Sequence, residues 1–183
     1  RATPEFPEGR RWFNLPGRDG VCMSVPCAGA WLPKGESNSL LRRASTMGAE
    51  VALLDADKVC GTDHLESAVM HARRAFERGT NAANTLGMEV ILYASGERQI
   101  SKAKRKMGLH AETERVAVVL LGEGDMDRVL EDLGLRRDDS LLDCTPSKIG
   151  AFGLDPRELE AVGEDRAQDL VLEKVAFVEL LKR

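Results

Sequence analysis

The chain has 183 residues, 43% of them hydrophobic and 31% charged, which suits one globular domain with a real core. Its net charge of −4 excludes a protein that binds polyanions over its whole surface, so any nucleic-acid contact must be a local basic patch. The four cysteines form no CxxC pair and the three histidines are scattered, so we expect reduced thiols, no metal and no cofactor. The longest strongly apolar run, residues 116–122, is too short to span a membrane, and the N-terminus lacks an apolar secretory core. We therefore expect a cytoplasmic protein.

The N-terminal part is predicted to begin irregularly and then to form short strands around a helix. Residues 1–20 hold three prolines, three glycines and few patterned apolar positions, which predicts an irregular segment. A strand is expected within residues 20–31, and Ser37 or Ser39 is expected to cap a short helix. A further strand is expected over residues 49–59.

The clearest predicted helix covers residues 62–79. Thr62 is a good N-cap, apolar residues recur at steps of three and four, and Gly79 ends the pattern. The sequence MEVILYAS at residues 88–95 is almost continuously apolar, which predicts a strand covered on both faces. Because another buried strand is predicted over residues 114–122, the region is expected to form a βαβ-like unit, with a right-handed crossover if its strands are parallel.

The C-terminal third is predicted to be mostly helical. Residues 123–134 form a short amphipathic helix, Pro156 marks another helix start, and the chain closes on a helix or strand rich in Leu and Val. No repeat, low-complexity tract or linker divides the chain. Residues 21–183 are therefore expected to form a single α/β (α+β) domain, in which a mixed β-sheet of about four to five strands packs with several helices.

The basic sequence YASGERQISKAKRKMG interrupts this acidic chain. Ser95 and Gly96 are expected where the predicted strand passes into a helix, with Ser95 as its N-cap and free backbone N–H groups suited to a phosphate or carboxylate. Arg98, Lys102 and Arg105 follow at a spacing that gives a stripe of like charge. Because like charges at this spacing repel, a polyanion bound across them would relieve the repulsion.

Positive charge is concentrated in the middle of the chain. Between residues 63 and 110 there are eight Lys or Arg against five Asp or Glu, whereas the whole chain is negative. Part of this charge is on the outer face of the 62–79 helix, at Arg73, Arg74 and Arg78. A solvated helix face is the simpler interpretation of those three residues.

No familiar catalytic motif is present. The chain lacks a P-loop, a GxSxG elbow and an HExxH zinc motif. His64 and His71 lie two turns apart, too far for one metal ion, and Asp55 and Asp57 are better explained as turn-forming carboxylates. One alternative is nevertheless a small-ligand α/β enzyme, with a phosphate site at the start of the basic helix and an acid or base among Asp55, Asp57 and His64. Another alternative is a protein–protein scaffold whose basic helix is merely solvated.

Two strings are more specific than a basic run: HARRAFERGTNAANTLGMEV at residues 71–90 and ASGERQI at residues 94–100. Over residues 51–121, together with the closing LEKVAFVELLKR, the chain resembles the PRPK-binding (TPRKB-like) family, particularly its archaeal branch. The members of that family are small, kinase-associated, tRNA-binding subunits of the KEOPS complex.

The resemblance implies a non-catalytic subunit that attaches to the small atypical kinase of the complex and grips the single-stranded CCA end of tRNA. The complex installs threonylcarbamoyl-adenosine beside the anticodon of tRNAs that read codons beginning with A. No motif marks the kinase-binding surface, and an exposed apolar patch on the C-terminal element or on the 62–79 helix is expected.

A CCA end offers phosphates and unstacked bases, which basic grooves, amides and flat side chains recognise. Basic and amide side chains around the two strings are therefore expected to line one cleft, with Lys104 and Lys106 extending its positive field. The predicted tRNA-binding residues are Arg73, Arg74, Arg78, Asn81, Asn84, Ser95, Gly96, Arg98, Gln99, Lys102 and Arg105.

Overall fold

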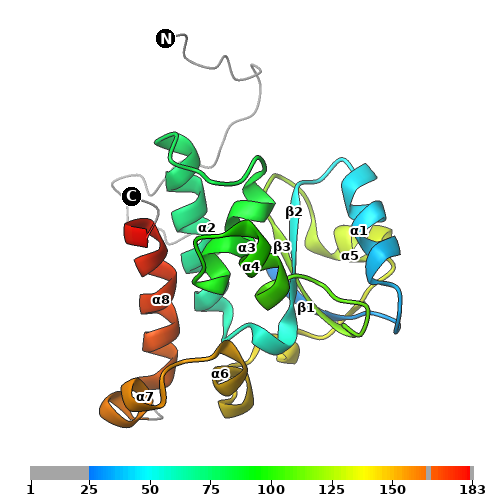
Figure 1. The fold of residues 1–183 in the computed structure, drawn as a ribbon. Coiled ribbons are helices and arrows are strands. Elements are labelled where there is room, and N and C mark those ends of the chain that lie inside the picture. The colour runs from blue at the N-terminus through cyan, green and yellow to red at the C-terminus, as the bar shows by residue number, and fades with distance from the viewer. Residues whose placement is uncertain (1–24, 164–165, 182–183) are drawn as a thin grey trace, which may run out of the picture.

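The fold is an antiparallel β-sheet between two layers of helices (Figure 1). The computed structural model describes residues 25–163 and 166–181, so the irregular segment predicted at residues 1–20 lies outside the described part. Among the helices of that part, none combines the length and the apolar character needed to cross a bilayer.

Strands and helices alternate along the first two thirds of the chain, and helices follow. The elements are β1 (Cys27–Trp31), α1 (Ser37–Thr46), β2 (Val51–Asp55), the 3-10 turn η1 (Ala56–Lys58), α2 (Thr62–Glu77), α3 (Leu86–Ser95), α4 (Ile100–Met107), β3 (Arg115–Leu120), α5 (Met126–Leu133), β4 (Arg136–Arg137), the 3-10 turn η2 (Asp139–Leu142), α6 (Pro146–Phe152), α7 (Pro156–Val162) and α8 (Ala167–Leu181).

The sheet has the strand order β2-β3-β1-β4, and each neighbouring pair is antiparallel. The side chains of β3 alternate between two cores, as the pleat of a strand requires. Ala117 and Val119 pack with the layer formed by α2, α3, α4 and α8, whereas Val116 and Val118 pack with α1 and α5. Because both faces of the sheet are covered, the central strand is buried along almost its whole length.

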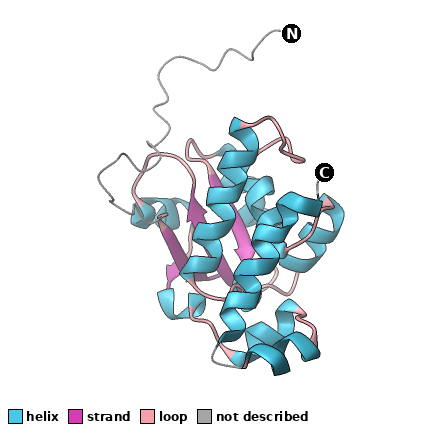
Figure 2. Ribbon diagram, turned by 90° about the vertical axis from the view of Figure 1, so that its left-hand side faces the viewer, coloured by secondary structure: helices cyan, strands magenta, loops and turns pink. Residues whose placement is uncertain are grey.

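The larger helical layer is held together by its two longest helices. Figure 2 shows α2 and α8 side by side in front of the sheet, and the two helices are in direct contact. At one end of α8, the short helices α6 and α7 enclose a small third core that includes Phe152 and Val171. The segment from α6 onward thus closes one end of the domain.

The predicted fold class is confirmed, but one predicted element is wrong. Strands are present within residues 20–31, 49–59 and 114–122, and the 62–79 helix is also present. Residues 88–95, predicted as a strand, belong to helix α3. The expected βαβ unit is therefore absent, and the sheet is antiparallel where a mixed sheet was expected.

Helix α3 has the apolar composition of a buried strand because it is enclosed on every side. It packs against β2, α2, α4 and α8, so it has no solvated face that would produce a helical period. Its ends carry the signals that identify a helix: the Thr85 hydroxyl accepts a hydrogen bond from Met88 N–H, and Gly96 adopts a left-handed conformation with φ of 69°.

The buried carboxylate of Glu89 fixes the loop between α2 and α3. Its Oε2 accepts hydrogen bonds from the backbone N–H groups of Ala82 and Ala83, at 3.0 and 2.8 Å. The Glu89 side chain is fully buried, so these charge-assisted bonds replace its lost contact with water. They hold the loop against the first turns of α3.

We expect Glu89→Ala to lower the free energy of unfolding by about 2–4 kcal/mol, because two backbone N–H groups lose their acceptor. Chemical denaturation measures this loss. Glu131→Ala, which removes an exposed carboxylate of α5, is the matched control and should change stability by less than about 0.5 kcal/mol. Equal stability of the two variants would contradict this role of Glu89.

Candidate nucleic-acid interface

Ser95 and Gly96 stand at the end of a helix, so the helix N-terminus that was expected there to hold a phosphate is wrong. Ser95 is fully buried, and its hydroxyl donates to the carbonyl of Leu92 at 2.7 Å and accepts from Glu97 N–H at 3.2 Å. A Cβ on Gly96 would lie 3.4 Å from Cβ of Lys174. Both residues shape the turn into α4, and the Ser95 hydroxyl is taken up by these local hydrogen bonds.

Helix α4 carries the main basic surface of the domain. Ala103 and Met107 are buried on its inner side. The outer side and the preceding turn form what we call the basic face, which consists of Arg98, Lys102, Lys104 and Arg105; all four side chains are exposed. None of the four makes an ion pair within the part of the chain that the structure describes. Gln99 is exposed beside them at the N-cap of α4.

Packing beneath α4 determines the position of the basic face. The Lys106 ammonium lies 3.9 Å from the ring centroid of Phe152, and burial lowers the pKa of Lys106. Phe152 in turn meets the ring of His64 edge-on, at a centroid distance of 5.6 Å. His64 Nδ1 accepts from Cys60 N–H, so Nε2 carries the proton and donates to the carbonyl of Ala94 at 2.8 Å. These contacts connect α6, the start of α2 and the end of α3 under the basic helix.

The remaining predicted residues lie around the junction of α2 and α3. Arg73 donates to the carbonyl of Leu121 at 3.0 Å, and Arg78 forms an ion pair with Glu179 of α8 at 2.7 Å. Asn81 donates to the carbonyl of Ala83 at 2.9 Å. These three side chains stabilise the fold.

Helix α3 separates the predicted residues into two groups. Arg73, Arg74, Arg78, Asn81 and Asn84 gather near its N-terminal end, whereas Ser95 through Gln99 follow its C-terminal end. Ten helical residues span about 15 Å. The structure therefore does not bring the two groups into one cleft, and their contact with tRNA stays a prediction.

The residues considered for catalysis also have structural partners. Asp55 accepts from Asp57 N–H at 3.1 Å and lies 3.3 Å from the Lys58 ammonium, and Asp57 pairs with Arg115 at 2.9 Å. In residues 25–163 and 166–181, no three His, Cys, Asp or Glu side chains are grouped to hold a metal ion. The Asp55 carboxylate thus forms a turn, as the simpler interpretation of the sequence predicts, whereas the Asp57 carboxylate pairs with Arg115 of β3.

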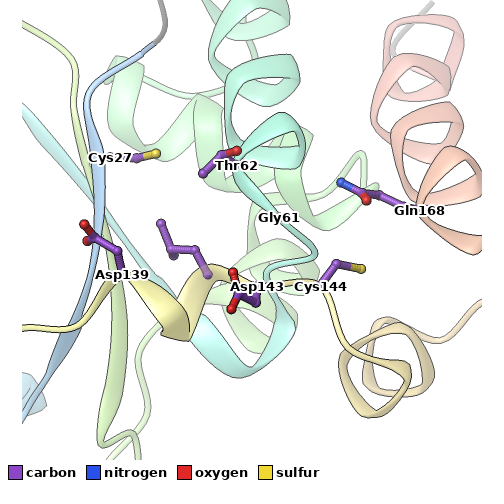
Figure 3. A pocket seen from close by; sticks show the side chains of 8 residues that line it. Cys27, Gly61, Thr62, Asp139, Asp143, Cys144 and Gln168 are labelled. Carbon is purple, nitrogen blue, oxygen red and sulfur yellow. The ribbon is translucent and has the colours of Figure 1, made fainter.

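Figure 3 shows the surroundings of a cavity of about 270 Å³. It contains none of the predicted tRNA-binding residues. Its lining comes from β1, the start of α2, the η2 segment and the start of α8, namely Cys27, Gly61, Thr62, Asp139, Leu142, Asp143, Cys144 and Gln168.

Helix α8 presents apolar side chains on two sides. Val171, Val175 and Val178 are buried in the domain. On another side of the same helix, toward its C-terminal end, Phe177, Leu180 and Leu181 are 48%, 56% and 38% exposed; we call these three residues the α8 apolar face. Their sequence signal is the closing Leu- and Val-rich element, in which apolar residues exceed what one buried stripe requires.

The buried imidazole of His64 generates a prediction about pH. Burial lowers its pKa from the ordinary 6.5 to about 4, so between these values the unfolded chain binds a proton that the folded chain does not. The contribution of the neutral His64 side chain to the free energy of unfolding should therefore be fully present above about pH 6.5. The free energy of unfolding should fall by about 2 kcal/mol between about pH 7 and pH 5.

Chemical denaturation across this range checks the expectation. His64→Gln should remove most of that pH dependence even if its stability is lower throughout, whereas His110→Gln, at an exposed position, should retain it. Burial also lowers the pKa of His71, which adds a smaller change of the same sign to all three proteins. An unchanged slope in His64→Gln would exclude His64 as the source.

Comparison with known proteins gives the family. Residues 36–151, from α1 into α6, match the family described as kinase binding protein CGI-121. The regulatory protein Cgi121 of Methanocaldococcus jannaschii is 30% identical over 137 residues, which cover 74% of this chain and 88% of that relative. The family description names kinase binding, and the name of the relative describes a regulatory protein. Both agree with the resemblance found in the sequence and with the non-catalytic role that it implies. The chain belongs to the kinase-binding CGI-121 family.

Proposed function

We propose that this protein is a non-catalytic KEOPS subunit that binds the small atypical kinase of the complex and holds the single-stranded CCA end of tRNA for threonylcarbamoyl-adenosine synthesis. Family membership supports the kinase-binding part. The observation that carries the tRNA part is the basic face of α4, because its four exposed cations have no carboxylate partner among the described residues, in a chain of net charge −4.

The chemistry of the basic face suits single-stranded RNA. Lys102, Lys104 and Arg105 supply charge for phosphates, and Arg98 and Gln99 add a guanidinium plane and an amide that can contact base edges. Tyr93 is buried, so base stacking in this proposal relies on guanidinium groups. Arg74 and Asn84, at the far end of α3, are secondary contacts that a longer stretch of RNA would reach.

We expect the double variant Lys102→Glu/Arg105→Glu to bind intact tRNA at least about tenfold more weakly than the natural protein, because two phosphate contacts become repulsive. The salt dependence of binding should become shallower as well. Fluorescence anisotropy with labelled tRNA at several salt concentrations measures both changes. CCA-trimmed tRNA should bind the natural protein more weakly than intact tRNA, and Arg98→Glu should reduce this difference.

The matched control is Arg42→Glu/Arg128→Glu, which changes the net charge equally but lies on α1 and α5, on the other side of the sheet. It should bind intact tRNA almost as the natural protein does. Equal binding of trimmed and intact tRNA would remove the CCA end from the proposal. Unchanged binding in the α4 double variant would favour the alternative of a scaffold with a solvated basic helix.

The α8 apolar face is the proposed docking site for the kinase. Exposed large apolar side chains at positions 177, 180 and 181 lie on one side of a helix that is anchored by its buried valines. A protein–protein contact that buries such an apolar cluster is stabilised by its removal from water. Because the family is described as kinase-binding, we take the kinase to be the protein that covers this face.

We expect Phe177→Glu to weaken binding of the complex's atypical kinase by about thirtyfold or more, because a charge would be buried in the contact. Biolayer interferometry with the immobilised kinase measures the loss, and tRNA binding of the same variant should be unchanged. Leu41→Glu, at a 45% exposed apolar position of α1, is the control. Equal kinase affinity of both variants would place the docking site elsewhere.

A further inference from the structure

Two cysteines from distant parts of the chain meet where α6 closes the domain. Cys60 comes just before α2, and Cys144 lies between η2 and α6. Their segments are joined by a hydrogen bond from Gly61 N–H to the carbonyl of Leu142, at 3.0 Å. A Cβ on Gly61 would stand 4.0 Å from Cβ of Cys144, and Cys144 packs against the small core that contains Cys60. Such proximity is the first requirement for a disulfide.

The two thiols differ in their access to solvent. Cys60 is fully buried in the small core with Phe152 and Val171. Cys144 is half-buried and lines the cavity of about 270 Å³. Figure 3 shows Cys27 on the opposite side of that cavity, on β1. A small reagent that enters the cavity therefore meets Cys144 before it can reach the buried Cys60.

The surroundings keep Cys60 unreactive toward reagents in solution. Burial, and after it the adjacent Cys144, raises the pKa of the Cys60 thiol to about 12. The ammonium groups of Lys148 and Lys106 act in the opposite direction, but more weakly. Lys148 is held in place by donating to the carbonyl of Leu141 at 2.5 Å. Cys60 is thus a protonated thiol at neutral pH, and only a partner held in contact with it can engage it.

We propose that Cys144 and Cys60 form a dithiol site that low-molecular-weight disulfides convert into an intramolecular disulfide. The site is independent of tRNA and kinase binding. Cys144 is the attacking thiol, because it is half-buried and lines the cavity, and Cys60 is the resolving thiol, because it is buried in the core against which Cys144 packs.

The reaction proceeds by two thiol–disulfide exchanges. The Cys144 thiolate attacks one sulfur of the small disulfide, the S–S bond of the reagent breaks, and the released thiolate takes up the proton that Cys144 lost. Cys60 then loses its proton and attacks the Cys144 sulfur, and the second half of the reagent leaves and is protonated. The protein has lost two electrons and two protons, and one small disulfide has become two thiols. Because Cys60 is rarely ionised, the second exchange is slow and becomes faster as the pH rises.

The bond would connect the two segments that support the basic helix. Cys60 adjoins the turn in which His64 holds the end of α3, and Cys144 precedes α6, which carries Phe152 under Lys106. Since it would also close a long loop of the unfolded chain, we expect the oxidised protein to melt roughly 5 to 15 °C higher than the reduced protein.

The test uses the folded full-length chain incubated with oxidised glutathione, followed by alkylation, intact mass spectrometry and peptide mapping. The variant Cys22→Ala/Cys27→Ala retains only the proposed pair. It should lose two hydrogen atoms, yield a linked Cys60–Cys144 peptide and melt at a higher temperature. Cys60→Ala should stop at glutathione bound to Cys144, whereas Cys144→Ala should leave Cys60 free.

Other outcomes would overturn the proposal. A stable glutathione adduct on Cys144 while Cys60 is present would show that the pair does not close. A bond between Cys144 and Cys22 or Cys27 in the natural chain would assign the site to other residues. Circular dichroism of each variant before oxidation checks that the chain is folded, so that a negative result counts against the pair itself.

Discussion

The burial of α3 is the constraint on which the rest of the domain depends. Nine of its ten residues are buried, so the helix has to be enclosed by β2 on one side and by α2, α4 and α8 on the others. Its polar side chains satisfy their hydrogen bonds locally: Glu89 binds the preceding loop, and the Ser95 hydroxyl binds Leu92 and Glu97. Because α4 covers α3 with Ala103 and Met107, Lys102, Lys104 and Arg105 are left exposed to solvent, whereas the Lys106 ammonium lies over the ring of Phe152.

In the elements that were predicted correctly, the spacing of the apolar residues matches the number of faces that the element buries. Helices at 62–79 and 123–134 each bury one face, and β3 is a short apolar run rich in valine. Residues 88–95 have no such period, because a helix enclosed on all sides and a strand covered on both faces are equally apolar. Only the ends distinguish the two, and Thr85 and Gly96 mark the ends of a helix.

This one misassigned element explains why the candidate site was only partly predictable. A strand ending at Ser95 would have placed a new helix N-terminus there, whereas the end of α3 leaves a buried hydroxyl and a glycine that packs on Lys174. The residue types of the basic face could be identified from the sequence. Their distance from the arginines of α2 could not, because it depends on the length and direction of α3 and not on spacing along the chain.

The arginines around α2 and the cations of the basic face differ in whether they have partners within the fold, and not in their charge. Around α2, Arg78 has Glu179 as a partner and Arg73 is bound to a backbone carbonyl, because both lie where helices and strands meet. Such side chains exchange water for protein contacts, and a ligand would have to compete for them. The cations of α4 lie on one outer side, where neighbouring lysines and arginines repel one another. Within the described residues, no ion pair would have to break before the cations of the basic face meet a ligand, and for this reason the shorter helix is the better candidate for RNA.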